Sequence, residues 1–322
     1  MRPVVLALVL TLAAAAPVGA TYPGRDGRIA FFARADCGRN SFPEDPCNAL
    51  AFSAVIAASP LGRDALQVAR CPGPTCAWVL PGAPRYSPDG RLIAVIGSIT
   101  SPAQLAILRT DGSEAQRIDV PATSLAGVDW LPDGRLVAYA FPERDGSASR
   151  TFVIGADGVA HEVIWRPKGG RAWSSRGDVA IGHVRGIYVS DRRSGVRRLV
   201  LPNGRRFTYG LGDWSPDGRR LVVVRQDVLT QLWTIVTVAA DGGDRRVVVR
   251  AVSAGCPFAG VVWSPSGARI AYVSGCYEAT AIYSVRTDGT GRRLIFEIGS
   301  LVGSTGLEPY MGREISWQPL RG

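Results

Sequence analysis

The chain has 322 residues, of which 46% are hydrophobic and 20% are charged, and its formal net charge is +10. This length suits one large all-β domain or two smaller domains. The positive charge suggests a polyanion ligand. However, Lys168 is the one lysine among 37 basic residues, which indicates a compositional bias toward arginine rather than a basic patch. No nucleic-acid-binding motif accompanies the charge, so we expect no nucleic-acid partner.

Residues 1–20 have the pattern of a secretory signal peptide. Arg2 is followed by the apolar run 4–16, and the segment ends in the small-residue pattern Val18-Gly19-Ala20. We therefore expect a mature chain that begins near Thr21, lies outside the cytoplasm (secreted or periplasmic) and has no transmembrane segment. A retained N-terminal anchor is the alternative, because the uncharged stretch 3–20 is at the lower length limit of a membrane-spanning helix.

The rest of the chain repeats an aromatic residue, a tight turn and a short apolar run five times. The aromatic residues are spaced by 44, 43, 41 and 49 residues, which is the length of one four-stranded propeller blade. The turns begin at Tyr86-Ser-Pro-Asp-Gly, Trp130-Leu-Pro-Asp-Gly, Trp173-Ser-Ser-Arg-Gly, Trp214-Ser-Pro-Asp-Gly and Trp263-Ser-Pro-Ser-Gly. We predict that each repeat aromatic packs in the core between neighbouring blades.

Three further strands follow each aromatic, so the predicted unit is a meander of four antiparallel strands, A to D from the centre outward. The B strands are predicted at 92–96, 136–140, 179–181, 221–224 and 270–273. The C strands are predicted at 105–108, 152–154, 187–189, 232–238 and 282–285, and each precedes a second turn, such as Asp111-Gly112 or Asp241-Gly242. A two-domain β-sandwich is the alternative architecture, but it would not need this motif at every forty-odd residues.

The two chain ends hold complementary halves of one more unit. Ile315-Ser-Trp317-Gln-Pro319 stops where a turn is due, and Asp26-Gly27-Arg28 begins with that turn. Pairing the two ends would close the ring and remove two exposed sheet edges. We therefore predict an all-β, six-bladed β-propeller over residues 21–322, closed by the N- and C-terminal strands.

With these Trp-Ser-Pro-Asp-Gly-Arg turns and the second Asp-Gly turns, the chain resembles the TolB-like six-bladed propellers, which are built from WD40-like (PD40) repeats. The resemblance implies the fold, and it leaves open whether the protein is a binding module or a peptidase-associated domain. The residues before Asp26 are too few for the α/β domain that precedes the propeller in TolB.

Six cysteines fit an oxidising compartment. In the predicted blades the cysteines all fall in B–C or D–A connections, which lie on one rim of the ring. Position 266, within the Ser264-Pro-Ser-Gly267 turn, is equidistant from Cys256 and Cys276, which makes these two cross-strand neighbours. We predict the disulfides Cys37–Cys47, Cys71–Cys76 and Cys256–Cys276. A zinc site at Cys71 and Cys76 is the alternative, but no second Cys/His pair lies nearby in the sequence.

Sequence motifs for catalysis are scarce. Gly-x-Ser-x-Gly, His-Glu-x-x-His and a calcium loop are absent from the sequence. Of the two histidines, we expect His161 on an outer strand facing solvent, whereas His183 ends a B strand on the cysteine rim and is a candidate ligand contact. Three acids on innermost strands, Asp129, Asp213 and Glu314, are candidates for the central channel.

From these observations we expect a monomeric, secreted, non-enzymatic propeller without cofactor or metal. Its partner would be a protein or an anionic cell-envelope polymer, bound through the rim formed by the B–C and D–A loops. That rim also carries the long predicted insertions 33–50, 70–83 and 299–313. The alternative is a propeller hydrolase or lyase that uses Asp129, Asp213 or Glu314 at the central channel.

Overall fold

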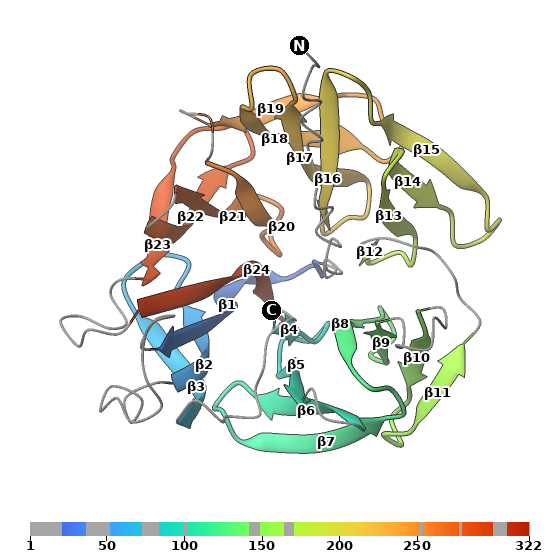
Figure 1. The fold of residues 1–322 in the computed structure, drawn as a ribbon, viewed down its shortest axis with the longest axis vertical. Coiled ribbons are helices and arrows are strands. Elements are labelled where there is room, and N and C mark those ends of the chain that lie inside the picture. The colour runs from blue at the N-terminus through green and yellow to red at the C-terminus, as the bar shows by residue number, and fades with distance from the viewer. Residues whose placement is uncertain are drawn as a thin grey trace, which may run out of the picture.

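The computed structural model describes residues 21–36, 52–72, 84–98, 102–141, 149–163, 171–251, 254, 256–276, 279–298 and 308–321. These residues form 24 strands in six antiparallel sheets of four strands each. The sheets stand as blades around one axis, so the molecule is a six-bladed β-propeller (Figure 1). The predicted fold is confirmed. In the described part of the chain, no helix has the length and apolar character needed to cross a membrane.

Five blades run through consecutive strands, with the first strand of each blade nearest the axis (Figure 1). The first two blades along the chain are β4 (Arg85–Tyr86), β5 (Leu92–Ser98), β6 (Ala103–Arg109) and β7 (Glu114–Val120), then β8 (Leu125–Trp130), β9 (Leu136–Ala140), β10 (Thr151–Ile154) and β11 (Ala160–Val163).

The next three blades repeat this meander. They are β12 (Arg171–Trp173), β13 (Val179–His183), β14 (Gly186–Ser190) and β15 (Arg197–Pro202); β16 (Phe207–Trp214), β17 (Arg220–Asp227), β18 (Trp233–Ala239) and β19 (Arg246–Arg250); and β20 (Phe258–Trp263), β21 (Arg269–Cys276), β22 (Ala279–Arg286) and β23 (Arg293–Glu297). The predicted B and C strands lie inside the observed ones, apart from Leu232, which directly precedes β18.

The sixth blade, called here the closing blade, joins the two ends of the chain. Its strands, in spatial order, are β24 (Glu308–Leu320), β1 (Arg25–Asp36), β2 (Phe52–Ala58) and β3 (Ala65–Pro72). The ladder between β1 and β24 sets Ile29 opposite Trp317 and Phe31 opposite Ile315. The C-terminal strand therefore supplies the innermost strand of a blade whose other three strands come from the N-terminal part.

The β1–β24 ladder is longer than the sequence indicates. Residues 33–36 and 308–313 were expected in loops, but they are strand residues, and the ladder continues to the pair Asp36 and Glu308. That expectation is wrong because two strands that pair with each other satisfy their backbone groups without needing a repeat motif in the sequence.

The repeated Ser-Pro-Asp-Gly turn has the same construction in different blades. In the turn after Trp214, the Ser215 hydroxyl donates to Asp217 Oδ1 at 2.6 Å and accepts from the Arg220 N–H at 2.9 Å. Gly218 has a φ of +65°, which suits glycine, and its N–H donates to the Ser215 carbonyl at 2.8 Å. The serine and the aspartate thus bond groups within the turn, which explains why both recur.

The repeat aromatics form contacts between blades, as predicted, and all but one of them are buried. Tyr86, Trp130, Trp214, Trp263 and Trp317 are all at most 6% exposed. Trp173 is only half-buried, and its indole N–H donates to the Tyr139 hydroxyl at 3.0 Å. Apolar clusters then continue from blade to blade; one of them joins Ile29 and Trp317 of the closing blade to Val262 and Ala271.

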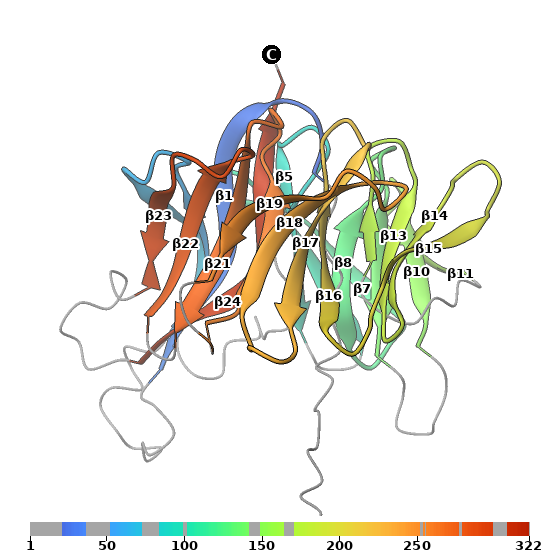
Figure 2. The same cartoon turned by 90° about the horizontal axis from the view of Figure 1, so that it is seen from above.

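The two rims of the ring differ in how they are built (Figure 2). One rim, called here the turn rim, carries the A–B and C–D turns, all of which lie in the described part of the chain. The other rim, called here the loop rim, carries the B–C and D–A connections. Many residues of these connections are outside the described part of the chain, and so are Cys37, Cys47 and Cys76.

Candidate functional site

Asp213, one of the predicted central acids, is buried on the innermost strand β16 with an exposure of 1%. Its Oδ1 accepts from the Trp214 N–H at 2.7 Å, and its Oδ2 accepts from the Trp263 N–H at 3.4 Å. Because Trp263 belongs to β20, this carboxyl joins the innermost strands of two neighbouring blades. The Asp213 carboxyl therefore has a structural role at the centre of the ring, where it links two blades.

The segment before β1 lies against Asp213. The Thr21 N–H donates to Asp213 Oδ1 at 3.2 Å, and the Thr21 hydroxyl bonds Asp213 Oδ2. The Tyr22 hydroxyl reaches a third blade, where it donates to the Trp130 carbonyl at 2.6 Å. Thr21 and Tyr22 are 3% and 5% exposed. Residues 21–24 thus cover the centre of the ring at the turn rim, where strands β8, β16 and β20 end.

Burial sets the ionisation of Asp213. Desolvation is the largest cause that raises its pKa, to about 8, and the negative charge of Asp129 adds to the effect. The hydrogen bonds from Thr21, Trp214 and Trp263 oppose the shift. Desolvation also raises the pKa of Tyr22 well above its usual value, again with help from Asp129 and Asp213. Asp129 and Asp213 therefore lie within electrostatic reach of each other.

The third predicted acid does not join this pair. Glu314, on β24, forms an ion pair of 2.6 Å with Arg85 on β4, where the Arg85 side chain is 3% exposed. A second Arg85 nitrogen donates to the Ile315 carbonyl at 3.3 Å. Glu314 thus connects the closing blade to the next blade. Among the described residues, no group of three His, Cys, Asp or Glu side chains could hold a metal ion.

The two histidines occupy the strands that the sequence predicts for them. His161 is exposed on the outer strand β11. His183 ends β13, and its Nδ1 accepts from the Arg185 N–H at 3.3 Å while its ring lies edge-on to Tyr188 at a centroid distance of 6.0 Å. These contacts hold His183 within its own hairpin, and its role as a ligand contact stays a prediction.

Cys256 lies just before β20 at the loop rim, is 6% exposed and is disulfide-bonded. The β20–β21 ladder sets Phe258 opposite Ser274. The same register, continued by two residues on each strand, sets Cys256 opposite Cys276. The register supports this pairing, which stays a prediction. The side chains of Cys71 and Cys276 lie outside the described residues, as do the other two predicted disulfides.

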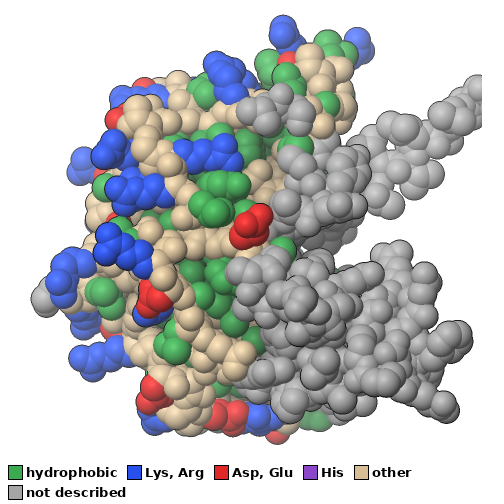
Figure 3. Space-filling model, turned by 90° about the vertical axis from the view of Figure 1, so that its left-hand side faces the viewer, with side chains coloured by type: hydrophobic (Ala, Val, Ile, Leu, Met, Phe, Trp, Pro, Cys, Tyr) green, Lys and Arg blue, Asp and Glu red, His purple; other side chains and the backbone are tan. Residues whose placement is uncertain are grey.

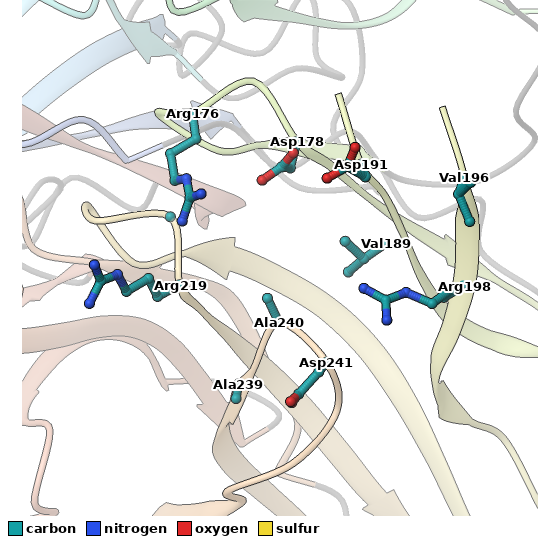
Figure 4. A pocket seen from close by; sticks show the side chains of 11 residues that line it. Arg176, Asp178, Val189, Asp191, Val196, Arg198, Arg219, Ala239, Ala240 and Asp241 are labelled. Atoms are coloured by element: carbon teal, nitrogen blue, oxygen red, sulfur yellow. The ribbon is translucent and has the colours of Figure 1, made fainter. Parts of the chain in front are cut away.

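Two cavities open on the turn rim, on the opposite side from the predicted binding rim. The smaller, of about 300 Å³, lies between the β12–β15 and β16–β19 blades and is flanked by Arg176, Arg198 and Arg219 (Figure 4). Its acids stabilise turns, since Asp241 Oδ1 accepts from the Gly243 N–H at 2.8 Å and Asp178 Oδ1 from the Arg192 N–H at 3.0 Å. Turn stabilisation accounts for these carboxylates.

The larger cavity, of about 820 Å³, lies between the β16–β19 and β20–β23 blades. Trp263 and Pro23, which belongs to the segment that covers the centre of the ring, form its inner end. At its outer end Arg220 and Arg246 both bind Asp244, at 2.6 and 2.9 Å. This cavity was not predictable from the sequence, because it arises from the spacing between two blades.

The arginines are spread along blade edges. In the view of Figure 3 they are interspersed with hydrophobic and acidic side chains over the described surface. Several stack on an aromatic ring of the adjacent strand: Arg197 lies 4.4 Å from the Tyr188 ring centroid and Arg292 lies 4.0 Å from that of Tyr283. Such stacking gives these arginines a packing role that does not depend on an anionic ligand.

Thr21 and Tyr22 are the residues that the sequence interpretation missed at this site. The one signal that could have found them is their position, directly after the predicted cleavage point and before the first strand of the ring. The sequence pointed to Asp213 as a candidate, but its partner Thr21 could not be inferred because it lies 192 positions away in the sequence.

The comparisons with known proteins concern the fold. The structure of TolB from Acinetobacter baumannii aligns with 91% of this chain and 67% of its own, with a TM-score of 0.66 and 17% identity. A TolB candidate from Agrobacterium tumefaciens aligns over 91% of this chain and all of its own, with a TM-score of 0.58 and 17% identity. No family model matches the sequence, and no curated protein matches it.

A third structure differs in ring closure. The β-propeller domain of the trilobed protease from Pyrococcus furiosus aligns over 87% of this chain and 84% of its own, with a TM-score of 0.51 and 13% identity, and is described as having an open velcro topology. In the present chain the ring is closed by the β1–β24 ladder. The chain is a TolB-like six-bladed β-propeller in fold.

Proposed function

We propose that the chain is a non-enzymatic propeller that acts outside the cytoplasm and binds a protein or an anionic cell-envelope polymer through its loop rim. The observation that carries the proposal is that residues 21–24 cover the centre of the ring at the turn rim, through the contacts of Thr21 with Asp213 and of Tyr22 with Trp130. A partner that used the centre of the ring would therefore approach from the loop rim.

The loop rim has features that suit recognition. The longest ladder of the ring, between β1 and β24, ends there at Asp36 and Glu308 (Figure 2). Cys256, which is disulfide-bonded, lies there too. A rigid ladder and cross-linked connections lower the entropy lost when loops bind a partner. The likeness to TolB structures supports a binding role by fold analogy alone.

One observation favours the second candidate, a hydrolase or lyase with central acids. A carboxyl whose pKa is about 8 keeps its proton at neutral pH and suits a general acid. Against this role, the Asp213 carboxyl is buried, and Thr21 occupies both of its oxygens. A substrate could reach it after residues 21–24 had left the centre. The binding role is therefore the better supported of the two.

Site-specific photo-crosslinking tests the proposal. A photoreactive amino acid is placed at position 36 or 308 on the loop rim, and at position 111 or 241 on the turn rim as matched controls. After irradiation of cells that export the protein, we expect adducts with one envelope component from the first two positions. Adducts from the control positions alone would contradict the proposal.

A further inference from the structure

The contact between Thr21 and Asp213 would change chemically if the chain were cleaved directly before Thr21. The main-chain nitrogen of Thr21 lies 3.2 Å from Asp213 Oδ1, and both residues are at most 3% exposed. No ion pair joins Asp213 to a basic side chain within the described residues. Asp129 adds a further carboxyl within electrostatic reach. A buried carboxyl of this kind lacks a cation that would balance the charge of its ionised form.

The sequence supplies such a cation at this atom. The small-residue pattern Val18-Gly19-Ala20 predicts cleavage of the bond between Ala20 and Thr21. Hydrolysis of that amide by water would leave a carboxylate on Ala20 and a primary amine on Thr21, which takes up a proton to become an ammonium group. The α-amino group has an ordinary pKa of roughly 7.7–8.0, so it is mostly protonated at neutral pH.

We propose that Asp213 is the binding site for the α-ammonium group of a mature N-terminus at Thr21. The inference rests on the predicted signal peptide and is independent of the partner-binding role. The ammonium would keep the hydrogen bond to Asp213 Oδ1 and add a charge–charge attraction in a site that excludes water. The hydroxyl bond from Thr21 and the Tyr22–Trp130 bond already hold the backbone in place.

In the unprocessed chain, the same nitrogen is a neutral amide, and the buried carboxyl lacks this counter-charge. Removal of the predicted signal peptide would thus add an ion pair to the contacts that residues 21–24 make with the innermost strands β16 and β20. The mature chain would therefore be more stable against unfolding than the unprocessed chain. This consequence makes the proposal measurable as a difference in thermal stability between two N-termini.

The main experiment compares two purified chains, one beginning at Thr21 and one beginning at Ala20, which moves the amine by one residue. We expect the chain that begins at Thr21 to have a Tm higher by roughly 5–15 °C. In Asp213→Asn the difference should fall to near zero. In the matched control Asp119→Asn, which changes an exposed acid on β7, it should persist. Equal Tm values, or a difference that survives Asp213→Asn, would overturn the proposal.

A second measurement covers the case in which Asp213→Asn does not fold. The mature chain would have two primary amines, the α-amine and Lys168. Acetylation at neutral pH, followed by mass spectrometry, gives the rate at each amine in the folded and the guanidinium-unfolded chain. We expect the Thr21 amine to be protected at least about tenfold by folding, because pairing raises its pKa and burial blocks the reagent. Equal rates would refute the site, as would a native N-terminus at another residue.

Discussion

The indole N–H of Trp214 donates to the carbonyl of Ala172 at 3.0 Å, and so joins β16 to the innermost strand of the preceding blade. Trp214 is 0% exposed and lies in a cluster with Ile187 and Leu221. Because Trp214→Ala would remove this contact and leave a cavity between blades, we expect it to cost about 3–5 kcal/mol in the free energy of unfolding. Urea unfolding measures the loss. The half-buried Trp173 is the comparison, and Trp173→Ala should cost clearly less.

The ion pair between Arg85 and Glu314 gives a second prediction. Both residues are on innermost strands, and Arg85 is 3% exposed. Replacing Arg85 removes the more buried half of this ion pair, so Arg85→Met should cost about 3–5 kcal/mol in the free energy of unfolding. The double variant Arg85→Met/Glu314→Met should cost less than the sum of the two single variants.

The exposed pair Arg135–Asp133, with both side chains 53% exposed, is the control for this comparison of single and double variants. Arg135→Met should change the free energy of unfolding by at most about 1 kcal/mol, because exposed ion pairs are screened by water. If the double variant lost as much free energy of unfolding as the two single variants combined, the two charges would not stabilise the blade contact together.

The sequence predicted the ring because each blade repeats the same local chemistry. A turn such as Ser215-Pro-Asp217-Gly218 bonds groups within itself, and an aromatic such as Trp214 packs against the preceding blade. Both features belong to one short motif that recurs in every blade, so one chain contains enough copies to reveal the pattern. The closing blade was predictable for the same reason, since Trp317 and Gly27 hold the two halves of that motif.

The site was less predictable because its contacts are long-range and lack a repeat. Thr21 meets Asp213 from a segment that has no counterpart in the other blades. Glu314 was grouped with the other central acids because it also precedes a tryptophan, but the guanidinium of Arg85 binds it. Which acid meets a cation and which meets a backbone amide depends on the arrangement of blades, and sequence spacing does not encode it.

Ring closure gives a third prediction. Removal of residues 315–322 would delete the buried side chains of Ile315 and Trp317 and expose the edge of β1. We expect a large fall in Tm together with aggregation, because an unpaired strand edge offers a template for other chains. Removal of Arg321 and Gly322 alone should leave the Tm nearly unchanged, since the β1–β24 ladder ends at Leu320. A Tm unaffected by the longer deletion would mean that the ladder contributes little to closure.

The last prediction concerns pH. In a chain whose Thr21 nitrogen is an amide, the folded-state pKa of Asp213 is about 8, whereas an unfolded aspartate has a pKa of about 3.9. The folded state therefore keeps a proton that the unfolded state loses, and the stability that this group contributes is complete below pH 4 and lost as pH rises toward 8. Asp129 and Tyr22 also interact electrostatically with Asp213.

The test is urea unfolding of the chain that begins at Ala20 at several pH values, with Asp213→Asn as the matched control. The slope of stability against pH should be more negative in the parent by at most about 1.4 kcal/mol per pH unit between pH 5 and 7. If the Thr21 ammonium binds Asp213, that extra slope should vanish in the chain that begins at Thr21, because a nearby cation lowers the pKa of the carboxyl. Identical slopes in parent and Asp213→Asn would show that this carboxyl does not titrate differently on folding.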